Sequence, residues 1–374
     1  MKNTIYKYFF HEFIRYFLVV LFASSAVIWT IQAVNFLDLV TEDGHAFRIY
    51  ITYSFLTLPK ILTKLIPFTF LIASILTIFK LEKDNELIIL WASGLNKIHI
   101  VNLIFRISVL TMFLQLMMAS VINPQTLFIS RNLIKDSELQ FIPSLLKEKR
   151  FNAAVENLTI FVDKKNKDGT YENIFIRDEG TILTNVSNGS STIFAKSGYI
   201  SNDSKSLVLL NGSIQKLESG GEISIVKFSK TSLNLSGLST KTTSEHKIQE
   251  TSTLHLIKCL IRKNIIIPNC SQTDDSRKDL MIEINKRFGM PFYIPLIGLI
   301  TCFLLSSRKE KAINRYSKHL YFIICFIILA GSEIAVRYSG LSFDHSISYY
   351  LIPLLLLPLI YFLLIRSFKY ENLK

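Results

Sequence analysis

The stretch "KDNELIILWASGLNKIHIV", residues 83–101, joins a charged segment to an apolar run that continues to Val121. Charged side chains are costly inside a bilayer, so such a junction is typical of a loop between two membrane spans. A helix needs about 20 apolar residues to cross the hydrocarbon core. Six runs meet this requirement, with approximate cores at residues 17–39, 50–79, 98–121, 288–305, 320–335 and 349–364. The sequence therefore predicts an α-helical membrane protein with six transmembrane helices.

Lysine and arginine predict the orientation of these spans, because short cytoplasmic loops carry an excess of basic residues. Basic residues are frequent at both termini and in the loops at residues 80–97 and 306–318, whereas the other two short loops hold only Arg48 and Arg337. We therefore expect both termini in the cytoplasm and the long segment between spans three and four outside. The net charge of +13 follows from this bias, and we expect no nucleic-acid partner.

Residues 150–236 show short alternating strands and turn residues in place of long apolar runs. In "LTIFVDKKNKDGTYENIFIRD" two alternating segments flank Lys167-Asp168-Gly169, and this pattern predicts a β-hairpin. Further turns are predicted at residues 188–189, 202–203, 211–212 and 220–221. We expect an inserted all-β domain that folds as an antiparallel sandwich, a jelly roll or a barrel.

No residue pattern typical of an enzyme occurs in this segment. It has no Cys/His spacing for a metal and no G-x-S-x-G motif, and His246 and His255 stand apart from any nucleophile. The whole chain also has no G-x-x-x-x-G-K-[ST] phosphate-binding loop. We expect no metal, no cofactor and no ATP hydrolysis by this chain itself. Cys259 and Cys270 can form a disulfide only in an oxidising compartment, and the sequence leaves their state open.

Two lysines interrupt the second apolar run, in the stretch "LPKILTKLIP". The spacing of Lys60 and Lys64 places both ammonium groups on one helix face, where like charges repel each other. They either extend to the lipid headgroups or line a cavity that binds an anionic lipid headgroup. We favour the cavity and predict that both lysines bind lipid.

Charged residues also stand at the fourth and fifth spans. In "MIEINKRFGMPFYIPL", Glu283 and Arg287 precede Pro291. This segment either anchors the fourth helix or transmits movement between the inserted all-β domain and the helix bundle. Glu333 and Arg337 are four residues apart in the fifth span, and we expect them to form an internal ion pair. We interpret that pair as a packing device rather than a part of transport.

The opening stretch is expected to form a short helix from Lys83 to Trp91 that Gly94 ends. Glu86 lies near its start, where the helix dipole favours an acid. Leu87, Ile88, Leu90 and Trp91 give the helix an apolar face. Such a helix either lies on the membrane surface or enters a groove on a partner protein. Surface helices are usually basic on their polar face, so we favour docking to a protein.

The order of these parts resembles a known family over nearly the whole chain. Three spans, a β-rich insertion, three more spans, "NELIILWASG" after span two and "IEINKRFGMPFYIPL" at span four resemble the LptF/LptG permeases of the lipopolysaccharide exporter. The resemblance implies a bacterial inner-membrane protein with a periplasmic, jelly-roll-like all-β domain. It implies membrane parts at residues 1–122 and 288–374, a coupling helix at about 82–95, and a periplasmic part at 123–287 with a β core at about 150–236.

The same resemblance implies the partners and several residue roles. A second LptF/LptG-like permease would pair with this chain, an LptB-like ATPase dimer would dock on the coupling helices, and an LptC-like periplasmic protein would receive lipopolysaccharide on its way to the outer membrane. Glu86 would be the coupling-helix acid and Gly94 its terminating glycine. Glu283, Arg287 and Pro291 would form the motif that begins span four.

Other functions are compatible with parts of the sequence. Permeases of lipoprotein-release or cell-division ABC systems usually have four spans, so the count of six disfavours them. A lipid- or glycan-modifying enzyme would need paired carboxylates, a metal cluster or a nucleophile, none of which we find. A membrane scaffold without transport would not need the two lysines of span two. The stretch "VENLTIFVDKKNKDGTYENIFIRD" slightly favours LptF over LptG.

Overall fold

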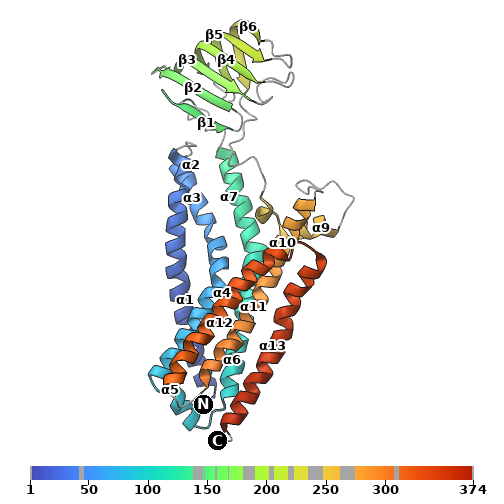
Figure 1. Ribbon diagram of the computed structural model, residues 1–374. Coiled ribbons are helices and arrows are strands. Elements are labelled where there is room, and N and C mark those ends of the chain that lie inside the picture. The colour runs from blue at the N-terminus through green and yellow to red at the C-terminus, as the bar shows by residue number, and fades with distance from the viewer. Residues whose placement is uncertain are drawn as a thin grey trace. The chain divides into compact units, whose positions relative to one another are not determined.

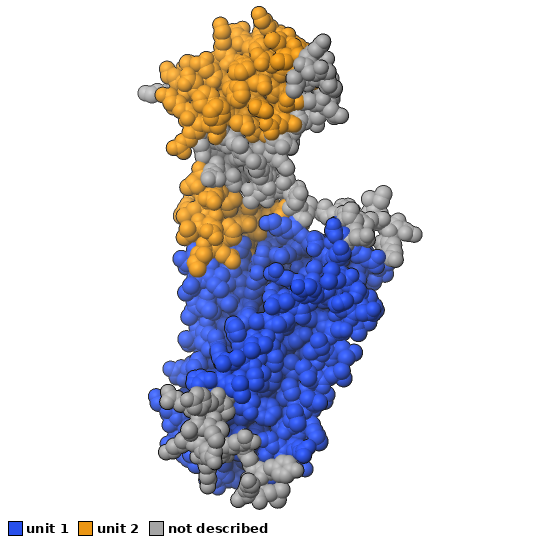
Figure 2. All heavy atoms as spheres, in the orientation of Figure 1, with its two compact units in different colours: residues 1–30, 57–127, 247–374 blue, residues 31–56, 128–246 orange. Residues whose placement is uncertain are grey.

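A computed structural model describes most of the polypeptide. It describes residues 2–41, 46–137, 146, 148–155, 158–166, 168–179, 190–201, 206–217, 223–234, 247–261, 274–306 and 311–372. Two compact units are present, residues 1–30, 57–127 and 247–374 in the first and residues 31–56 and 128–246 in the second. Figure 2 colours the two units separately. Each unit has its own hydrophobic core.

Helices make up the first unit and parts of the second. Their bounds are α1 (Lys2–Asn35), α2 (Asp38–Thr41), α3 (Phe47–Leu56), α4 (Leu58–Lys83), α5 (Glu86–Ala92), α6 (Lys97–Met117), η1 (Met118–Ile122), α7 (Asn123–Ser137), η3 (Ile248–Glu250), α9 (Thr253–Ile261), α10 (Asp274–Gly289), η4 (Met290–Phe292), α11 (Tyr293–Thr301), η5 (Cys302–Leu305), α12 (Lys311–Tyr338) and α13 (Phe343–Asn372).

Within the described residues, six helical stretches are long and apolar enough to cross a membrane. They are Thr4–Thr41, Phe47–Lys83, Lys97–Ile134, Asp275–Leu305, His319–Tyr338 and Phe343–Lys369. Each of them contains or overlaps one of the apolar runs of the sequence. The prediction of a six-span helical membrane protein is therefore confirmed.

The core of the first unit is built around α11. All nine of its residues are buried, and α4, α6, α12 and α13 pack against it, as Figure 1 shows. A helix that is apolar on every side is stable only when neighbours surround it. By contrast, α1, α12 and α13 expose large apolar side chains such as Val19, Ile327 and Leu355. Those faces suit lipid tails or other membrane helices.

The second unit contains a six-stranded antiparallel sheet. Its strands are β1 (Phe151–Val155), β2 (Leu158–Lys165), β3 (Thr170–Asp178), β4 (Ser191–Ile200), β5 (Ser206–Leu217) and β6 (Ile223–Asn234). This confirms the inserted all-β part of the fold prediction. The described strands do not show the jelly-roll-like form that we expected, because each strand pairs with the next one in the chain. Jelly rolls contain Greek-key crossovers, and the described strands have none.

The predicted hairpin at residues 158–178 is confirmed. Its two strands pair antiparallel from Leu158 opposite Asp178 to Lys165 opposite Tyr171. In the turn, the Gly169 amide donates a hydrogen bond to the Asn166 carbonyl oxygen at 3.1 Å. The predicted turns at residues 188–189, 202–203 and 220–221 lie outside the described residues.

The predicted turn at residues 211–212 is wrong. Both residues lie inside β5, and pairing with β4 and β6 continues on either side in unchanged register. Asn211 adopts a φ of 51° within the strand. A Cβ on Gly212 would lie 2.1 Å from the carbonyl oxygen of Phe194 and 2.5 Å from the ring of Phe228. Asn-Gly favours hairpin turns, but here pairing with two neighbouring strands keeps the dipeptide inside β5, and the close approach of Phe194 and Phe228 requires the glycine.

Three of the four cysteines lie within the described residues. Cys302 and Cys325 are buried free thiols in the first unit, as packing residues would be. Cys259 is disulfide-bonded, whereas Cys270 lies outside the described residues.

Candidate functional site

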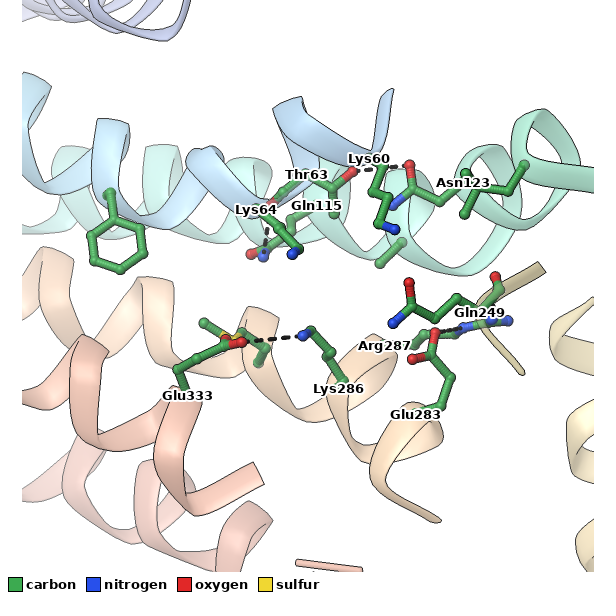
Figure 3. Close-up of a pocket in the computed structure, with 14 residues that line it drawn as sticks. Lys60, Thr63, Lys64, Gln115, Asn123, Gln249, Glu283, Lys286, Arg287 and Glu333 are labelled. Atoms are coloured by element: carbon green, nitrogen blue, oxygen red, sulfur yellow. Dashed lines mark hydrogen bonds and ion pairs between the residues drawn. The ribbon is translucent and has the colours of Figure 1, made fainter. Parts of the chain in front are cut away.

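A pocket of about 300 Å³ lies in the first unit, and Figure 3 shows its two facing walls. Side chains from α4 and from the α6–α7 segment form one wall, and side chains from α10 and α12 form the other. The lining residues are Lys60, Thr63, Lys64, Phe68, Gln115, Ala119, Asn123, Leu127, Gln249, Glu283, Lys286, Arg287, Met290 and Glu333. The pocket therefore joins cationic groups to an apolar surface. Besides the two lysines of span two, its lining includes Glu283, Arg287 and Glu333, which the sequence had also singled out.

The two lysines of α4 point into this pocket (Figure 3). Pro59 stands in the first turn of α4, where a missing amide donor is tolerated, and the regular helix places Lys60 and Lys64 on one face. Lys60 is half-buried and Lys64 is exposed. In the described part of the chain neither ammonium group has a hydrogen-bond or ion-pair partner. The pocket thus carries positive charge that the described residues leave uncompensated.

Hydrogen bonds hold this wall of the pocket together. The Thr63 hydroxyl bonds to the Pro59 carbonyl oxygen at 2.8 Å and lies 3.3 Å from Asn123 Oδ1. Gln115 Nε2 donates to the Thr63 carbonyl oxygen at 3.4 Å. These contacts join α4 to α6 and α7, so the two lysines project from a wall whose helices are linked by hydrogen bonds.

Arg287 on the opposite wall is fixed by several partners. Its side chain is only 3% exposed, and Nε donates to Glu283 Oε1 at 2.9 Å. Nη1 donates to the Thr251 carbonyl oxygen and to Thr253 Oγ1, and Nη2 donates to the Gln249 carbonyl oxygen. A buried guanidinium is stable only when such acceptors surround it. Glu283 and Arg287 therefore join α10 to the segment around η3.

The expected ion pair between Glu333 and Arg337 does not form. Glu333 Oε1 instead lies 3.1 Å from Lys286 Nζ, which joins α12 to α10. Arg337 is exposed, one helical turn further along α12. Spacing along one helix permitted the predicted pair, but the packing of α10 beside α12 offered a closer partner. Pro291 is buried in η4, the turn that separates α10 from α11.

The short helix α5 begins at Glu86, three residues later than predicted, because Lys83 still belongs to α4. Gly94 ends it as predicted, with a φ of +78°. The Gly94 amide donates to the Trp91 carbonyl oxygen at 3.0 Å, and the Leu95 amide donates to the Leu90 carbonyl oxygen at 3.2 Å. These two bonds form a Schellman motif, which favours glycine at the left-handed position.

The predicted apolar face of α5 is divided between the core of the first unit and the surface. Leu87 is buried, and Leu90 and Trp91 pack partly buried against the core of the first unit. Ile88 and Ile89 are each 65% exposed. The structure therefore contradicts Leu87 as an exposed docking residue, whereas Ile88 of the same predicted face is exposed. Apolar residues lie on both sides of α5, and the sequence pattern did not reveal which side packs on the bundle.

Two residues of α1 that the sequence analysis missed connect α1 to the region around α5. The Tyr8 hydroxyl donates to Glu86 Oε1 at 3.0 Å. Glu12 Oε2 lies 2.8 Å from Lys80 Nζ near the end of α4. An acid close to an apolar run is a signal that could have identified Glu12. Tyr8 gives no such signal, because its partner lies 78 residues away.

Comparison with known proteins agrees with this architecture. The family model "Lipopolysaccharide export system permease LptF/LptG" matches residues 7–367. An uncharacterized protein of Rickettsia prowazekii is 24% identical over 298 residues, which cover 78% of this chain and 80% of that protein. The family match includes all six spans and the inserted sheet. The chain therefore belongs to the LptF/LptG family of lipopolysaccharide export permeases.

Proposed function

We propose that this chain is one permease subunit of an ATP-driven exporter that extracts lipopolysaccharide from the bacterial inner membrane. The observation that carries the proposal is the pocket in which Lys60 and Lys64 lack ion-pair partners among the described residues. Ammonium groups bind phosphate through charge-assisted hydrogen bonds. Phe68 and Leu127 add apolar surface to the same pocket. A phosphorylated amphiphile combines the two properties that this lining requires.

The position of the lysines along α4 supports the same proposal. Lys60 precedes Lys80 by 20 residues in one helix, which corresponds to about 30 Å of rise. This is about the thickness of the hydrocarbon core. With Lys80 at the cytoplasmic surface, the pocket lies at the level of the periplasmic headgroups. Both termini are then cytoplasmic and the inserted sheet is periplasmic.

The energy for transport would come from an LptB-like ATPase dimer, because the chain has no recognisable phosphate-binding loop. Ile88, Ile89 and Glu86 of α5 would form the surface on which this partner docks. The bonds from Tyr8 to Glu86 and from Glu12 to Lys80 would transmit its movement to α1 and α4. Such movement can expel lipid only if the two states of the pocket bind it with different free energies.

Two further partners complete the proposal. A second LptF/LptG-like permease would cover part of the apolar surface that α1, α12 and α13 expose. The inserted sheet would pass lipopolysaccharide to an LptC-like protein and so to a periplasmic bridge toward the outer membrane. No cofactor is required in this chain, since the ATPase subunit would bind the nucleotide.

Co-purification tests this proposal directly. The chain would be tagged after Lys374, extracted gently from its native membrane, and analysed for bound proteins and lipids by mass spectrometry. We expect a P-loop ATPase, a second six-span chain and lipopolysaccharide. Recovery of the chain alone, or with a lipoprotein-release system, would overturn the proposal.

A further inference from the structure

The cationic side chains of the pocket are held in three different ways. Arg287 has four hydrogen-bond acceptors around it. Lys286 has a single partner, Glu333. Lys60 and Lys64 have no ion-pair partner within the described residues. Because cations outnumber carboxylates in the lining, an anion that enters the pocket gains attraction from more than one of them.

We propose that Lys286 is a third ligand for the anionic headgroup, and that Glu333 is an exchangeable counter-ion which the headgroup displaces. This inference rests on the proposed function, since it requires a phosphate-bearing occupant. Figure 3 shows Lys286 on the wall opposite Lys60 and Lys64, with its ammonium group directed toward Glu333. A phosphate group between the walls would therefore meet lysines from both sides.

The geometry of the Lys286–Glu333 pair suits exchange. One contact of 3.1 Å joins the two groups, and their side chains remain 31% and 39% exposed. Ion pairs that are not fully buried contribute little to stability. A lysine ammonium has three donors, and a phosphate oxygen forms charge-assisted hydrogen bonds. A multiply charged phosphate can therefore replace the single carboxylate of Glu333.

Arg287 and Glu283 are unsuited to the same exchange. The Arg287 side chain is almost fully buried, and its removal from four acceptors would leave several polar groups without partners. Asn285 also holds α10 in place, since its Nδ2 donates to Ser339 Oγ at 2.9 Å and to Ser346 Oγ at 2.8 Å. Headgroup binding would thus release one ion pair between α10 and α12 while these other contacts persist.

Two substitutions with opposite expected effects test the inference. The full chain, purified with its co-purifying subunits, would be titrated in detergent with bisphosphorylated lipid A. We expect Glu333→Gln to tighten binding about fivefold, because it removes the competing carboxylate. Lys286→Gln should weaken binding about fivefold, because it removes a phosphate ligand. Effects of equal sign, or no effect of either variant, would overturn the inference.

The double variant Lys286→Gln/Glu333→Gln removes both charges of the ion pair, so it controls for a folding defect that a single unpaired charge could cause. It should melt close to the wild type and bind lipid A more weakly than Glu333→Gln alone; equal binding by these two proteins would refute a role for Lys286. Arg337→Gln and Asp344→Asn change exposed charges outside the pocket. Both controls should bind like the wild type, and a change as large as that of the pocket variants would refute a local effect.

Two further probes separate this inference from the proposed function. Dephosphorylated lipid A should bind the wild type more weakly than the bisphosphorylated form. Equal binding of both forms would overturn the proposed function itself, whereas discrimination by the wild type without opposite effects of the variants would overturn only the inference. Inorganic pyrophosphate should compete only in large excess. Competition at the concentration of lipid A would assign the site to free phosphate and refute the headgroup as occupant.

Discussion

The two ends of α4 carry lysines in opposite circumstances. Near its end, Lys80 lies 2.8 Å from Glu12 of α1. Near its start, Lys60 and Lys64 have no ion-pair partner among the described residues. An ammonium group in a membrane protein is costly unless an anion or water compensates it. The charge of Lys80 is therefore balanced within the chain, whereas the other end of α4 is suited to an anion that arrives from outside.

The proposed function assigns different roles to these two ends of α4. At the end that contains Lys80, polar contacts join α1 to α4 and α5, and Ile88 and Ile89 are the exposed large apolar residues of α5. At the other end, charge and apolar surface face a cavity. One end is suited to receive force from a partner protein and the other to hold a ligand.

The largest effect is expected at the exposed face of α5. The double variant Ile88→Asp/Ile89→Asp should abolish recovery of the ATPase with the tagged chain, because each buried isoleucine contributes about 1.5–3 kcal/mol to an interface. The amount of co-purifying ATPase would be measured. Ile225→Asp/Val226→Asp changes residues that are each 57% exposed on β6 and should leave recovery unchanged. ATPase retained by the α5 variant would refute this face as the docking surface.

The ion pair at the compensated end should contribute clearly to stability. Glu12→Ala leaves Lys80 without its 2.8 Å partner, and we expect a loss of about 2 kcal/mol in the free energy of unfolding. Thermal unfolding of the detergent-solubilised chain measures this change. Lys64→Ala, at the other end of α4, should change stability by less than about 0.5 kcal/mol. Equal losses in both variants would remove the contrast between the two ends.

Charge reversal at the uncompensated end should affect lipid more than assembly. Lys60→Glu/Lys64→Glu should reduce the lipopolysaccharide that co-purifies by about tenfold or more, because two attractive contacts become repulsive. The ATPase and the second permease should still be recovered. Lys60→Arg/Lys64→Arg keeps both charges and serves as the matched control. Unchanged lipid retention in the reversed variant would restore the interpretation that these lysines only reach the headgroup region.

The smallest effect concerns the end of α5. Gly94→Ala should lower the free energy of unfolding by about 1 kcal/mol, because alanine disfavours the φ of +78° found there. No heavy atom lies within 4 Å of the added Cβ, so the cost is that of the backbone alone. Gly331→Ala meets equally open space in α12 and should be neutral or stabilising by up to about 1 kcal/mol. Equal melting temperatures would contradict this account.

Local chemistry explains which features could be predicted. Apolar runs of sufficient length indicated the six spans, and alternation around Asp168 and Gly169 indicated the hairpin. Gly94 was identified as the end of α5 because a left-handed residue there favours glycine. The dipeptide Asn211-Gly212 misled for the same reason, since its local preference for a turn is overridden by strands on both sides.

Contacts between distant residues could not be read from the pattern. Glu333 had two candidate partners, and only the position of α10 beside α12 selected Lys286 over Arg337. Tyr8 reaches Glu86 because α1 begins at the end of the bundle where α5 lies. The burial of Leu87 likewise depends on which side of α5 meets the core.

The sequence by itself determined the class of this protein, its spans and the family to which it belongs, because hydropathy, turn chemistry and short motifs act over a few neighbouring residues. The tertiary structure alone decided which charges are paired and which face the pocket. Ion pairing depends on distances of about 4 Å between side chains, and helix packing brings side chains that close regardless of their separation in the chain. The pair Glu12–Lys80 and the unpaired Lys60 and Lys64 share one helix, and packing alone makes them different.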